Sequence, residues 1–255
     1  MDALDELYLA LKNASAPMAF TGAGVSTLSG IRDFRGKNGV YREPWRGMAV
    51  EDLLSLDVFE QDPSLFYGWA REFVYQLDRF RPGAVHILLA ELEAAGMLRE
   101  VVTQNIDLLH QRAGSRKVCE IHGSPAHHHC RQCGAERSYD EVAPVVMAGN
   151  VPHCPSCGGV LKPDIIFYGE GLDERCLSHA FAAMASCDFL LVMGSSLTVQ
   201  PAASLPVEAA RHGAEIVIVN DQPTPLDRLA KRRFSSLEEV AEGLLERLRR
   251  DRPEK

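Results

Sequence analysis

Two cysteine pairs are the strongest chemical signal in the sequence. Cys130 and Cys133 form one Cys-x-x-Cys pair, Cys154 and Cys157 form a second, and 20 residues separate the pairs. Thiolates at this spacing are typical of a tetrahedral zinc site, and four of them leave no coordination position for water. We therefore predict one structural zinc ion, with iron as the alternative metal. A redox-active dithiol is the competing interpretation, and the second pair disfavours it.

The other sulfur and imidazole groups have less distinctive spacing. Cys119, Cys176 and Cys187 have no partner at metal-binding spacing and are predicted to be core residues. The adjacent histidines 127–129 could donate nitrogen ligands, but four thiolates already suffice. The seven cysteines are odd in number and four of them have metal spacing, which indicates a reducing compartment rather than a disulfide framework.

A glycine-rich turn follows the first apolar run of the chain. Residues 21–26 read Thr-Gly-Ala-Gly-Val-Ser, and such a turn lets backbone N–H groups approach a pyrophosphate at a helix N-terminus. Thr27 stands where the third glycine of the full fingerprint would be, so an ordinary tight turn is an equal alternative on the glycines alone. The next segment, Gly-Ile-Arg-Asp-Phe-Arg-Gly (30–36), has the composition of a mobile loop that closes over a ligand.

Polar residues also follow the later apolar runs. They are Thr-Gln-Asn-Ile-Asp at 103–107, His122, Gly-Ser-Ser at 194–196 and Asn-Asp at 220–221. The carboxyl ends of parallel strands share one edge of a sheet, where α/β proteins bind ligands; a helix cap or turn is the alternative for each cluster. A histidine with a pKa of about 6.5 suits a general base, although a lone histidine is more often structural. Together with the glycine-rich turn, these four clusters favour one nucleotide-binding crevice.

Short β-branched runs that alternate with helical patterns would position these clusters. The predicted strands are Pro17–Thr21, Glu100–Thr103, Val118–Ile121, Asp164–Phe167, Asp188–Met193 and Glu215–Val219. The predicted helices are His86–Ala95, Glu174–Ala185, Leu205–His212 and Leu237–Arg249. Several runs are apolar throughout, as parallel strands covered on both faces are, so we expect an α/β fold with a doubly wound, Rossmann-like parallel sheet.

Two segments interrupt the alternation. Residues 36–81 read as loop and helices, and residues 122–159 hold the cysteine pairs. We expect these segments to form a smaller domain, made of a zinc ribbon and a helical insertion. The ranges 1–35, 82–121 and 160–250 would then form one discontinuous nucleotide-binding domain.

Composition and charge narrow the function further. The 255 residues are 46% hydrophobic and 24% charged, as in globular proteins, and the formal net charge is −8. An acidic protein repels phosphate backbones, so we expect no direct nucleic-acid partner, and a basic peptide is more plausible. The acidic N-terminus is unlike a signal peptide, and no apolar run reaches about 18 residues. We therefore expect a cytoplasmic protein that spans no membrane.

The order and spacing of all these motifs agree with one known family. The set comprises Gly-Ala-Gly-Val-Ser-Thr-Leu-Ser-Gly-Ile-Arg-Asp-Phe-Arg-Gly (22–36), Thr-Gln-Asn-Ile-Asp (103–107), His-Gly (122–123), the two cysteine pairs, Gly-Ser-Ser-Leu (194–197) and Val-Asn (219–220). The chain resembles the sirtuins, NAD-dependent protein lysine deacylases, from about Leu7 to Leu248, and above all the compact bacterial and archaeal members. The resemblance implies NAD as cosubstrate and one structural zinc ion.

The resemblance also implies a role for each motif residue. His122 would be the general base and Asn105 the second catalytic residue. The residues that would bind the cofactor are Gly22, Ala23, Gly24, Thr27, Asp33, Phe34, Arg35, Gln104, Asn105, Ile106, Asp107, His122, Gly194, Ser195, Ser196, Asn220 and Asp221. An acyl-lysine peptide would add as an extra strand along Ile166, Phe167, Tyr168, Gly169 and Glu170.

The family mechanism needs one base and a shielded site. By resemblance, the acyl oxygen attacks C1′ of the nicotinamide ribose as nicotinamide leaves, which gives an alkylimidate. His122 then removes a ribose hydroxyl proton, and Phe34 shields the sugar from water. Release of free lysine and O-acyl-ADP-ribose follows, and a monomer is adequate for this chemistry. Two alternatives stay open: a mono-ADP-ribosyltransferase or NAD glycohydrolase, and a non-enzymatic NAD-sensing interaction module.

Some positions depart from the family pattern. Arg32 stands where sirtuins usually have proline, which loosens the loop and adds charge near the phosphates. Tyr168 adds a hydroxyl to the usual aromatic pair, and we expect it to make the acyl channel more polar. Sirtuins that remove succinyl groups carry a tyrosine and an arginine three residues apart on a helix. Here the residue three positions after Tyr67 is Ala70, and Arg71 is turned about 100° around the helix from that position. We therefore expect the enzyme to remove an uncharged acyl group.

Overall fold

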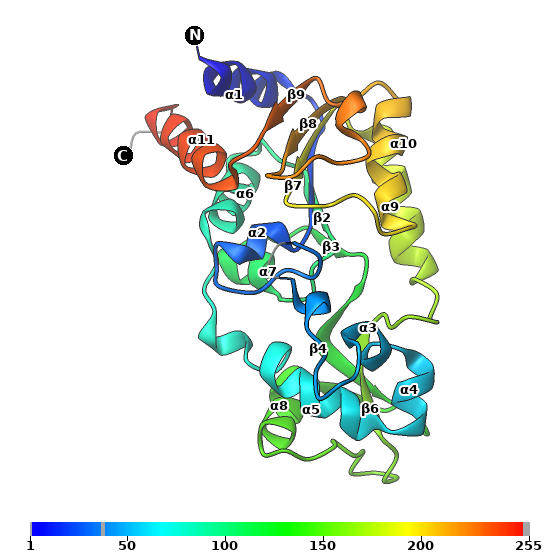
Figure 1. Ribbon diagram of the computed structural model, residues 1–255. Helices are drawn as coiled ribbons and strands as arrows, with labels where there is room; N and C mark the ends of the chain where they lie inside the picture. The colour runs from blue at the N-terminus through cyan, green and yellow to red at the C-terminus, as the bar shows by residue number, and fades with distance from the viewer. Residues whose placement is uncertain (1, 37–38, 252–255) are drawn as a thin grey trace.

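The computed structural model describes residues 2–36 and 39–251, which form two lobes, each with its own β-sheet (Figure 1). The larger lobe holds a six-stranded parallel sheet in the order β3-β2-β1-β7-β8-β9. Its strands are β1 Pro17–Thr21, β2 Glu100–Thr103, β3 Val118–Glu120, β7 Phe189–Met193, β8 Glu215–Val219 and β9 Arg232–Phe234. Successive strands run outward from β1 on one side and from β7 on the other, which makes the β1–β7 junction the switch point of a doubly wound sheet.

Helices cover both faces of this sheet. They are α1 Ala3–Asn13, α6 Ala84–Ala94, α7 Leu109–Ala113, α9 Glu174–Ser186, α10 Leu205–Arg211 and α11 Leu237–Asp251. On β7, Phe189, Leu191 and Met193 belong to the core that includes α1, α6 and α11, whereas Leu190 and Val192 belong to the core with α9 and α10. Strand side chains alternate between faces, so one apolar strand serves both cores, and each buried large side chain contributes roughly 1.5–3 kcal/mol.

The smaller lobe has an antiparallel sheet in the order β5-β4-β6. Its strands are β4 Gly123–Cys130, β5 Glu136–Ser138 and β6 Leu161–Ile165. Its helices are α3 Val50–Leu53, α4 Leu56–Gln61, α5 Pro63–Phe73 and α8 Tyr139–Met147. One aromatic core joins the two sequence segments, because Phe59 and Phe66 contact Phe167 with ring centroids 5.5 and 4.8 Å apart.

Short helical turns complete the described chain. They are α2 Gly24–Thr27 and the 3₁₀ helices η1 Val40–Arg42, η2 Leu77–Arg79, η3 Ala202–Ser204 and η4 Asp227–Leu229. None of the helices in the described ranges is long and apolar enough to cross a membrane.

The predicted α/β fold is confirmed, and five of the six predicted strands belong to the parallel sheet. The prediction of a strand at Asp164–Phe167 in the parallel sheet is wrong both in its bounds and in the sheet to which the strand belongs. The strand is β6, Leu161–Ile165, and it pairs antiparallel with β4 in the smaller sheet. The apolar Ile-Ile-Phe run indicated a buried strand, but an apolar run does not show which sheet buries it.

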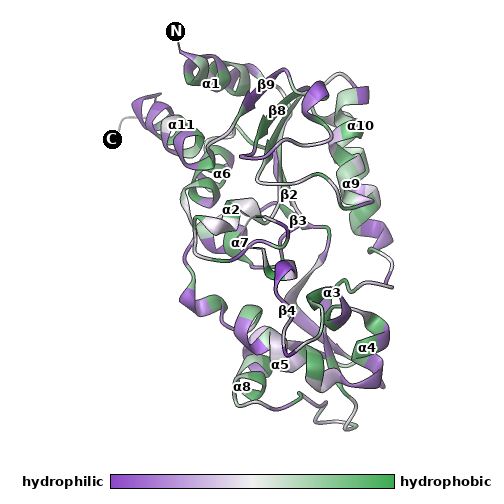
Figure 2. Cartoon of the chain, in the orientation of Figure 1, coloured by the Kyte–Doolittle hydropathy of each residue, from purple (hydrophilic) through white to green (hydrophobic). Residues whose placement is uncertain are grey.

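The edge strand β9 was not predicted. It reads Arg-Arg-Phe and lies beside the apolar β8, a contrast that Figure 2 shows as purple beside green. Its polarity is what an edge position permits, because one side of the strand has no neighbouring strand to pair with. The four predicted helices correspond to α6, α9, α10 and α11, with ends shifted by up to two residues.

Candidate active site and metal centre

Glycines bring the turn after β1 against the turn after β7. The Gly24 N–H donates to the Gly194 carbonyl oxygen at 2.8 Å, and the Gly22 N–H donates to the Met193 carbonyl oxygen at 3.1 Å. A Cβ at Gly24 or Gly22 would lie 2.7 or 2.8 Å from the Gly194 carbonyl oxygen, so both positions require glycine. The two turns form one floor at the switch point of the sheet. Ala23 is half-buried there.

The polar residues after β2 meet a buried serine on α2. Ser26 Oγ donates to Asp107 Oδ2 at 2.6 Å, and Asn105 Nδ2 donates to Ser26 Oγ and to the Gly22 carbonyl oxygen at 3.2 Å each. All three side chains are buried. Asp107 Oδ1 also accepts the Leu109 N–H at the start of α7. The alternative that this polar cluster caps the next helix is therefore correct as well. Ser26 therefore fixes the orientation of both the amide and the carboxylate.

We expect Ser26→Ala to lower the free energy of unfolding by about 1–3 kcal/mol, because a buried carboxylate and a buried amide lose their shared partner. Urea unfolding of the two proteins measures the difference. Ser29→Ala is the matched control, since the Ser29 hydroxyl is buried without a partner among the described residues. If both variants unfolded at the same urea concentration, the hydroxyl of Ser26 would not hold the network.

His122 lies after β3, beside the loop that follows β2. Its Nδ1 is 3.0 Å from the Gln104 carbonyl oxygen. Because a carbonyl oxygen only accepts, Nδ1 carries the proton in the neutral ring and Nε2 is the basic nitrogen. Burial lowers the pKa of His122, the hydrogen bond to Gln104 acts against burial, and the charge of Arg35 lowers the pKa further. The ring is therefore neutral at pH 7 and able to accept a proton.

The 30–36 loop is joined to the segment after β6 by side-chain contacts. Arg35 Nη2 donates to the Tyr168 hydroxyl at 3.1 Å, and the Tyr41 and Tyr168 hydroxyls are 3.0 Å apart. Phe34 packs on Tyr41 with ring centroids 5.2 Å apart. Asp33 Oδ1 accepts the N–H of residue 36 at 3.0 Å, which closes the loop. The effect of Tyr168 on an acyl channel stays a prediction.

The remaining predicted cofactor residues follow β1, β2, β7 and β8. Ser195 Oγ donates to Gln104 Oε1 at 2.7 Å, which ties the β7 turn to the β2 loop. The side chains of Asn220 and Thr27 bond to carbonyl oxygens of their own turns at 2.8 Å each. Ser196 and Asp221 are exposed, and Ile106 packs partly against the core of the smaller lobe.

The segment Ile166–Glu170 links the two lobes. The Ile166 N–H donates to the His122 carbonyl oxygen at 2.9 Å, and the Tyr168 N–H donates to the Leu54 carbonyl oxygen at 2.7 Å. Glu170 Oε2 accepts the Phe167 N–H at 2.7 Å and the buried Lys162 ammonium at 2.8 Å. Gly169 is exposed, and no described residue hydrogen-bonds to its backbone. Gly169 lies in a turn, with a φ of 92°.

The four paired cysteines converge in the smaller lobe. Their Sγ atoms lie within 4.8 Å of one another, with 3.5 Å between Cys130 and Cys157 and 3.7 Å between Cys133 and Cys154. A tetrahedron with Zn–S bonds of about 2.3 Å has S···S edges of about 3.8 Å, so the arrangement fits zinc. The four-thiol donor set leaves no open position, which agrees with a structural ion.

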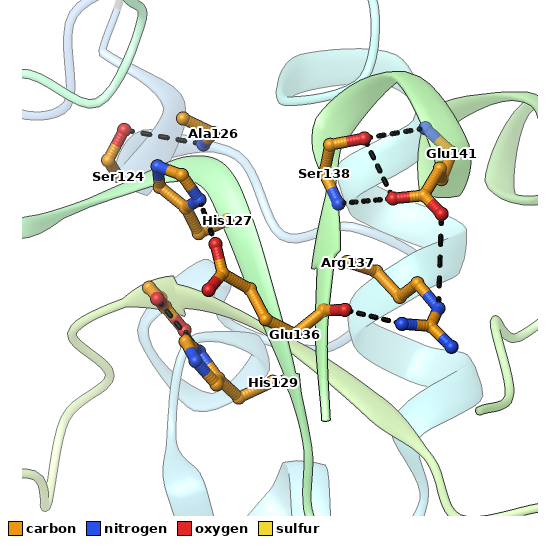
Figure 3. Close-up of polar contacts among 9 residues, drawn as sticks. Ser124, Ala126, His127, His129, Glu136, Arg137, Ser138 and Glu141 are labelled. Atoms are coloured by element: carbon orange, nitrogen blue, oxygen red, sulfur yellow. Dashed lines mark hydrogen bonds and ion pairs between the residues drawn. The ribbon is translucent and has the colours of Figure 1, made fainter. Parts of the chain in front are cut away.

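The three adjacent histidines do not join this cluster. His127 Nδ1 lies 2.5 Å from Glu136 on β5 (Figure 3). His129 Nδ1 lies 2.8 Å from Asp164 on β6. His128 points to the opposite face, where its ring is buried 2.6 Å from the Tyr75 hydroxyl. The alternation of strand side chains explains the split.

Several residues of the site were given no role in the sequence analysis. They are Ser26, Tyr41 and Lys162, whose partners lie 81, 127 and 8 residues away in the chain. Ser26 lies inside the glycine turn and could have been identified as a polar residue on a short helix. Nothing in the sequence marked Tyr41 or Lys162.

These features define a class of protein: an α/β protein whose glycine turns meet at the switch point of a doubly wound sheet, with a four-cysteine module in a second lobe. The model of the Sir2 family matches residues 22–201. An NAD-dependent protein deacetylase of Thermotoga maritima is 39% identical over 89% of this chain and 91% of its own, and an NAD-dependent protein deacylase of Aeropyrum pernix is 40% identical over 88% of each. A solved Sir2 structure with a deacetylated p53 peptide and 3′-O-acetyl ADP ribose has a TM-score of 0.89 and 36% identity, covering 96% of this chain and 98% of that one. The chain belongs to the Sir2, or sirtuin, family.

Proposed function

We propose that this protein is an NAD-dependent protein lysine deacylase. It removes an uncharged acyl group from lysine and releases nicotinamide and O-acyl-ADP-ribose. The observation that carries the proposal is His122, half-buried and neutral, oriented by the Gln104 carbonyl oxygen beside the Asn105–Ser26–Asp107 network. A general base with a defined tautomer next to a glycine-lined crevice is what this reaction needs.

Each turn of the crevice has a distinct role toward NAD. Gly22, Gly24 and Gly194 let the pyrophosphate approach the backbone, because no Cβ intervenes. Ser195 and Ser196, with Ala23 and Thr27, border the phosphates. Asn220 and Asp221, after β8, serve the adenosine half, since β8 lies beyond β7 from the switch point.

The nicotinamide half lies toward β2 and β3. Asn105 and Gln104 hold the nicotinamide ribose, and Ile106 and Asp107 hold the amide. Bound NAD supplies a good leaving group on C1′ of this ribose. His122 Nε2 then takes the proton of a ribose hydroxyl, while Phe34 and the loop through Asp33 and Arg35 exclude water.

An acyl-lysine peptide binds between the lobes along Ile166–Glu170. Main-chain pairing with this segment tolerates different peptide sequences. The net charge of −8 favours a basic peptide around the lysine and disfavours nucleic acid. A single copy of the chain contains every residue in this proposal, so a monomer is adequate.

We also propose the division into a discontinuous NAD-binding domain (1–35, 82–121, 160–250) and a small domain (36–81, 122–159). The separate sheets and the common core of the smaller lobe support it, although β6, within 160–250, pairs with the smaller sheet. Zinc holds the small domain together and takes no part in the reaction. Four zinc-binding cysteines that form no disulfide support a reducing, cytoplasmic location.

Product analysis tests the function. Purified protein is incubated with NAD and an acetyl-lysine peptide, and all products are followed by mass spectrometry. We expect nicotinamide, deacetylated peptide and O-acetyl-ADP-ribose in equal amounts. Free or protein-linked ADP-ribose without deacetylated peptide would instead indicate an NAD glycohydrolase or an ADP-ribosyltransferase, and binding without turnover would indicate a sensing module.

We expect a succinyl-lysine peptide to react with a kcat/KM about 100-fold below that of the acetyl-lysine peptide, because α5 offers no tyrosine and arginine three residues apart to hold its carboxylate. The Tyr67 hydroxyl is buried and donates to the Leu161 carbonyl oxygen. The Arg71 guanidinium lies beside Gly149, after α8. Initial rates with the two peptides check this, and faster succinyl removal would contradict it.

The pH profile should report His122. The base is active when neutral, and burial lowers its pKa below about 6.5, so kcat/KM should stay level at neutral pH and fall only as the pH drops below that value. Rates measured between pH 5 and 9 check the expectation. An acidic limb centred above pH 7 would contradict the lowered pKa.

A further inference from the structure

Two cysteines outside the zinc cluster face each other across the larger lobe. Cys119 on β3 and Cys176 in the first turn of α9 have Sγ atoms 3.0 Å apart, and the two residues are 57 positions apart in the chain. This separation is about 1 Å longer than a disulfide bond. The two residues were predicted to be core residues, and Cys119 is buried, but Cys176 is half-exposed. Both border a pocket of about 730 Å³.

The two thiols differ in exposure and in the direction in which their pKa values are shifted. The contact with Cys119 holds the pKa of the Cys176 thiol below its usual range, while the same contact and burial raise that of Cys119. Cys176 also lies near the N-terminus of α9, where Asp173 accepts its N–H at 2.7 Å. A partly exposed thiol at a helix start, 3.0 Å from a buried thiol, is the arrangement of an attacking cysteine and a resolving cysteine.

The elements that carry the pair also lead to the proposed active site. Cys119 is three residues before His122, and α9 begins four residues after Glu170. A bond between the sulfurs would therefore join the strand that ends near the base to the helix that follows the peptide segment.

We propose that Cys119 and Cys176 form a reversible oxidation site, at which a hydroperoxide converts the two thiols into a disulfide. The Cys176 thiolate attacks the terminal oxygen of the peroxide, so an S–O bond forms and the O–O bond breaks, and hydroxide leaves from hydrogen peroxide or an alkoxide from an organic hydroperoxide. The Cys119 sulfur then attacks the Cys176 sulfur. The S–S bond forms, the sulfenic oxygen leaves as water with the Cys119 proton, and a dithiol reductant reverses the reaction.

The test uses the zinc-loaded full-length protein carrying Cys187→Ser, treated with a few equivalents of hydrogen peroxide and then alkylated. The protein is digested without reduction by trypsin and Glu-C together, which release Cys119 in the peptide 118–120. Cys176 is the first residue of a second peptide, and Cys187→Ser makes it the only cysteine in that peptide. We expect these two peptides to be linked in most molecules while one zinc ion per chain is retained. Dithiothreitol should restore both thiols.

Thermal melting supplies a second readout. The disulfide closes a loop of 57 residues, so we expect oxidation to raise the Tm by roughly 5 °C. Cys176→Ser should abolish both the linked peptide and the Tm rise, and Cys119→Ala should do the same. The proposal is overturned if zinc is released while Cys119 and Cys176 still alkylate, or if Cys176 reaches sulfinic acid while Cys119 stays a free thiol.

Discussion

Replacing His122 with alanine should lower the rate of lysine deacylation about 10²–10⁴-fold, the usual effect of losing a general base. The ring is oriented by a hydrogen bond from Nδ1 to the Gln104 carbonyl oxygen, which leaves Nε2 as the basic nitrogen. In the proposed mechanism His122 acts after nicotinamide leaves. Nicotinamide release in the presence of acetyl peptide should therefore fall less than O-acetyl-ADP-ribose formation.

Separate assays of nicotinamide and O-acetyl-ADP-ribose check this order of events. His212→Ala is the control, because His212 is an exposed residue just after α10. Binding of NAD, measured by calorimetry, should change little in His122→Ala, since the base is not what holds the phosphates. Near wild-type deacylation by His122→Ala would remove His122 from the mechanism.

Replacing one zinc thiolate should have the largest effect on the fold. Cys130 and Cys154 are both ligand candidates and members of the core of the smaller lobe. Structural zinc contributes roughly 10–16 kcal/mol of apparent binding free energy, as much as the whole stability of an ordinary domain. We therefore expect Cys154→Ser to bind less than about 0.1 zinc ion per chain, to lose the ordered small lobe and to lose deacylation.

Metal analysis and circular dichroism measure these outcomes. Cys187→Ala is the matched control, because Cys187 is buried in the larger lobe and should leave one zinc ion bound. If Cys154→Ser still bound one zinc ion per chain, another residue would have to be the fourth ligand. If wild-type protein held no metal and cycled between thiols and disulfides, the dithiol interpretation would replace the zinc site.

The local signals of the chain are reliable where neighbours in sequence decide the structure. The strands β1, β2 and β8 have the predicted bounds. A short, mostly apolar run between turn residues is too short for a typical helix, so a buried strand is the favoured structure. The cysteine pairs are equally local, since two residues between thiols already place both within reach of one ion. The two pairs meet at one site only because the end of β4 lies close to the loop that precedes β6, which is a tertiary contact.

Long-range contacts decided the rest. The shared hydroxyl of Ser26 joins groups 81 residues apart, and the Arg35–Tyr168 contact spans 133 residues. The same holds for the pairing of β6 with β4 and for Cys119 facing Cys176. A local pattern records how polar or apolar each residue is, which is enough to predict elements and motif residues. It does not record which distant surface fills the remaining space, and that packing alone determines the tautomer of His122, the partners of Asn105 and the distance between two thiols.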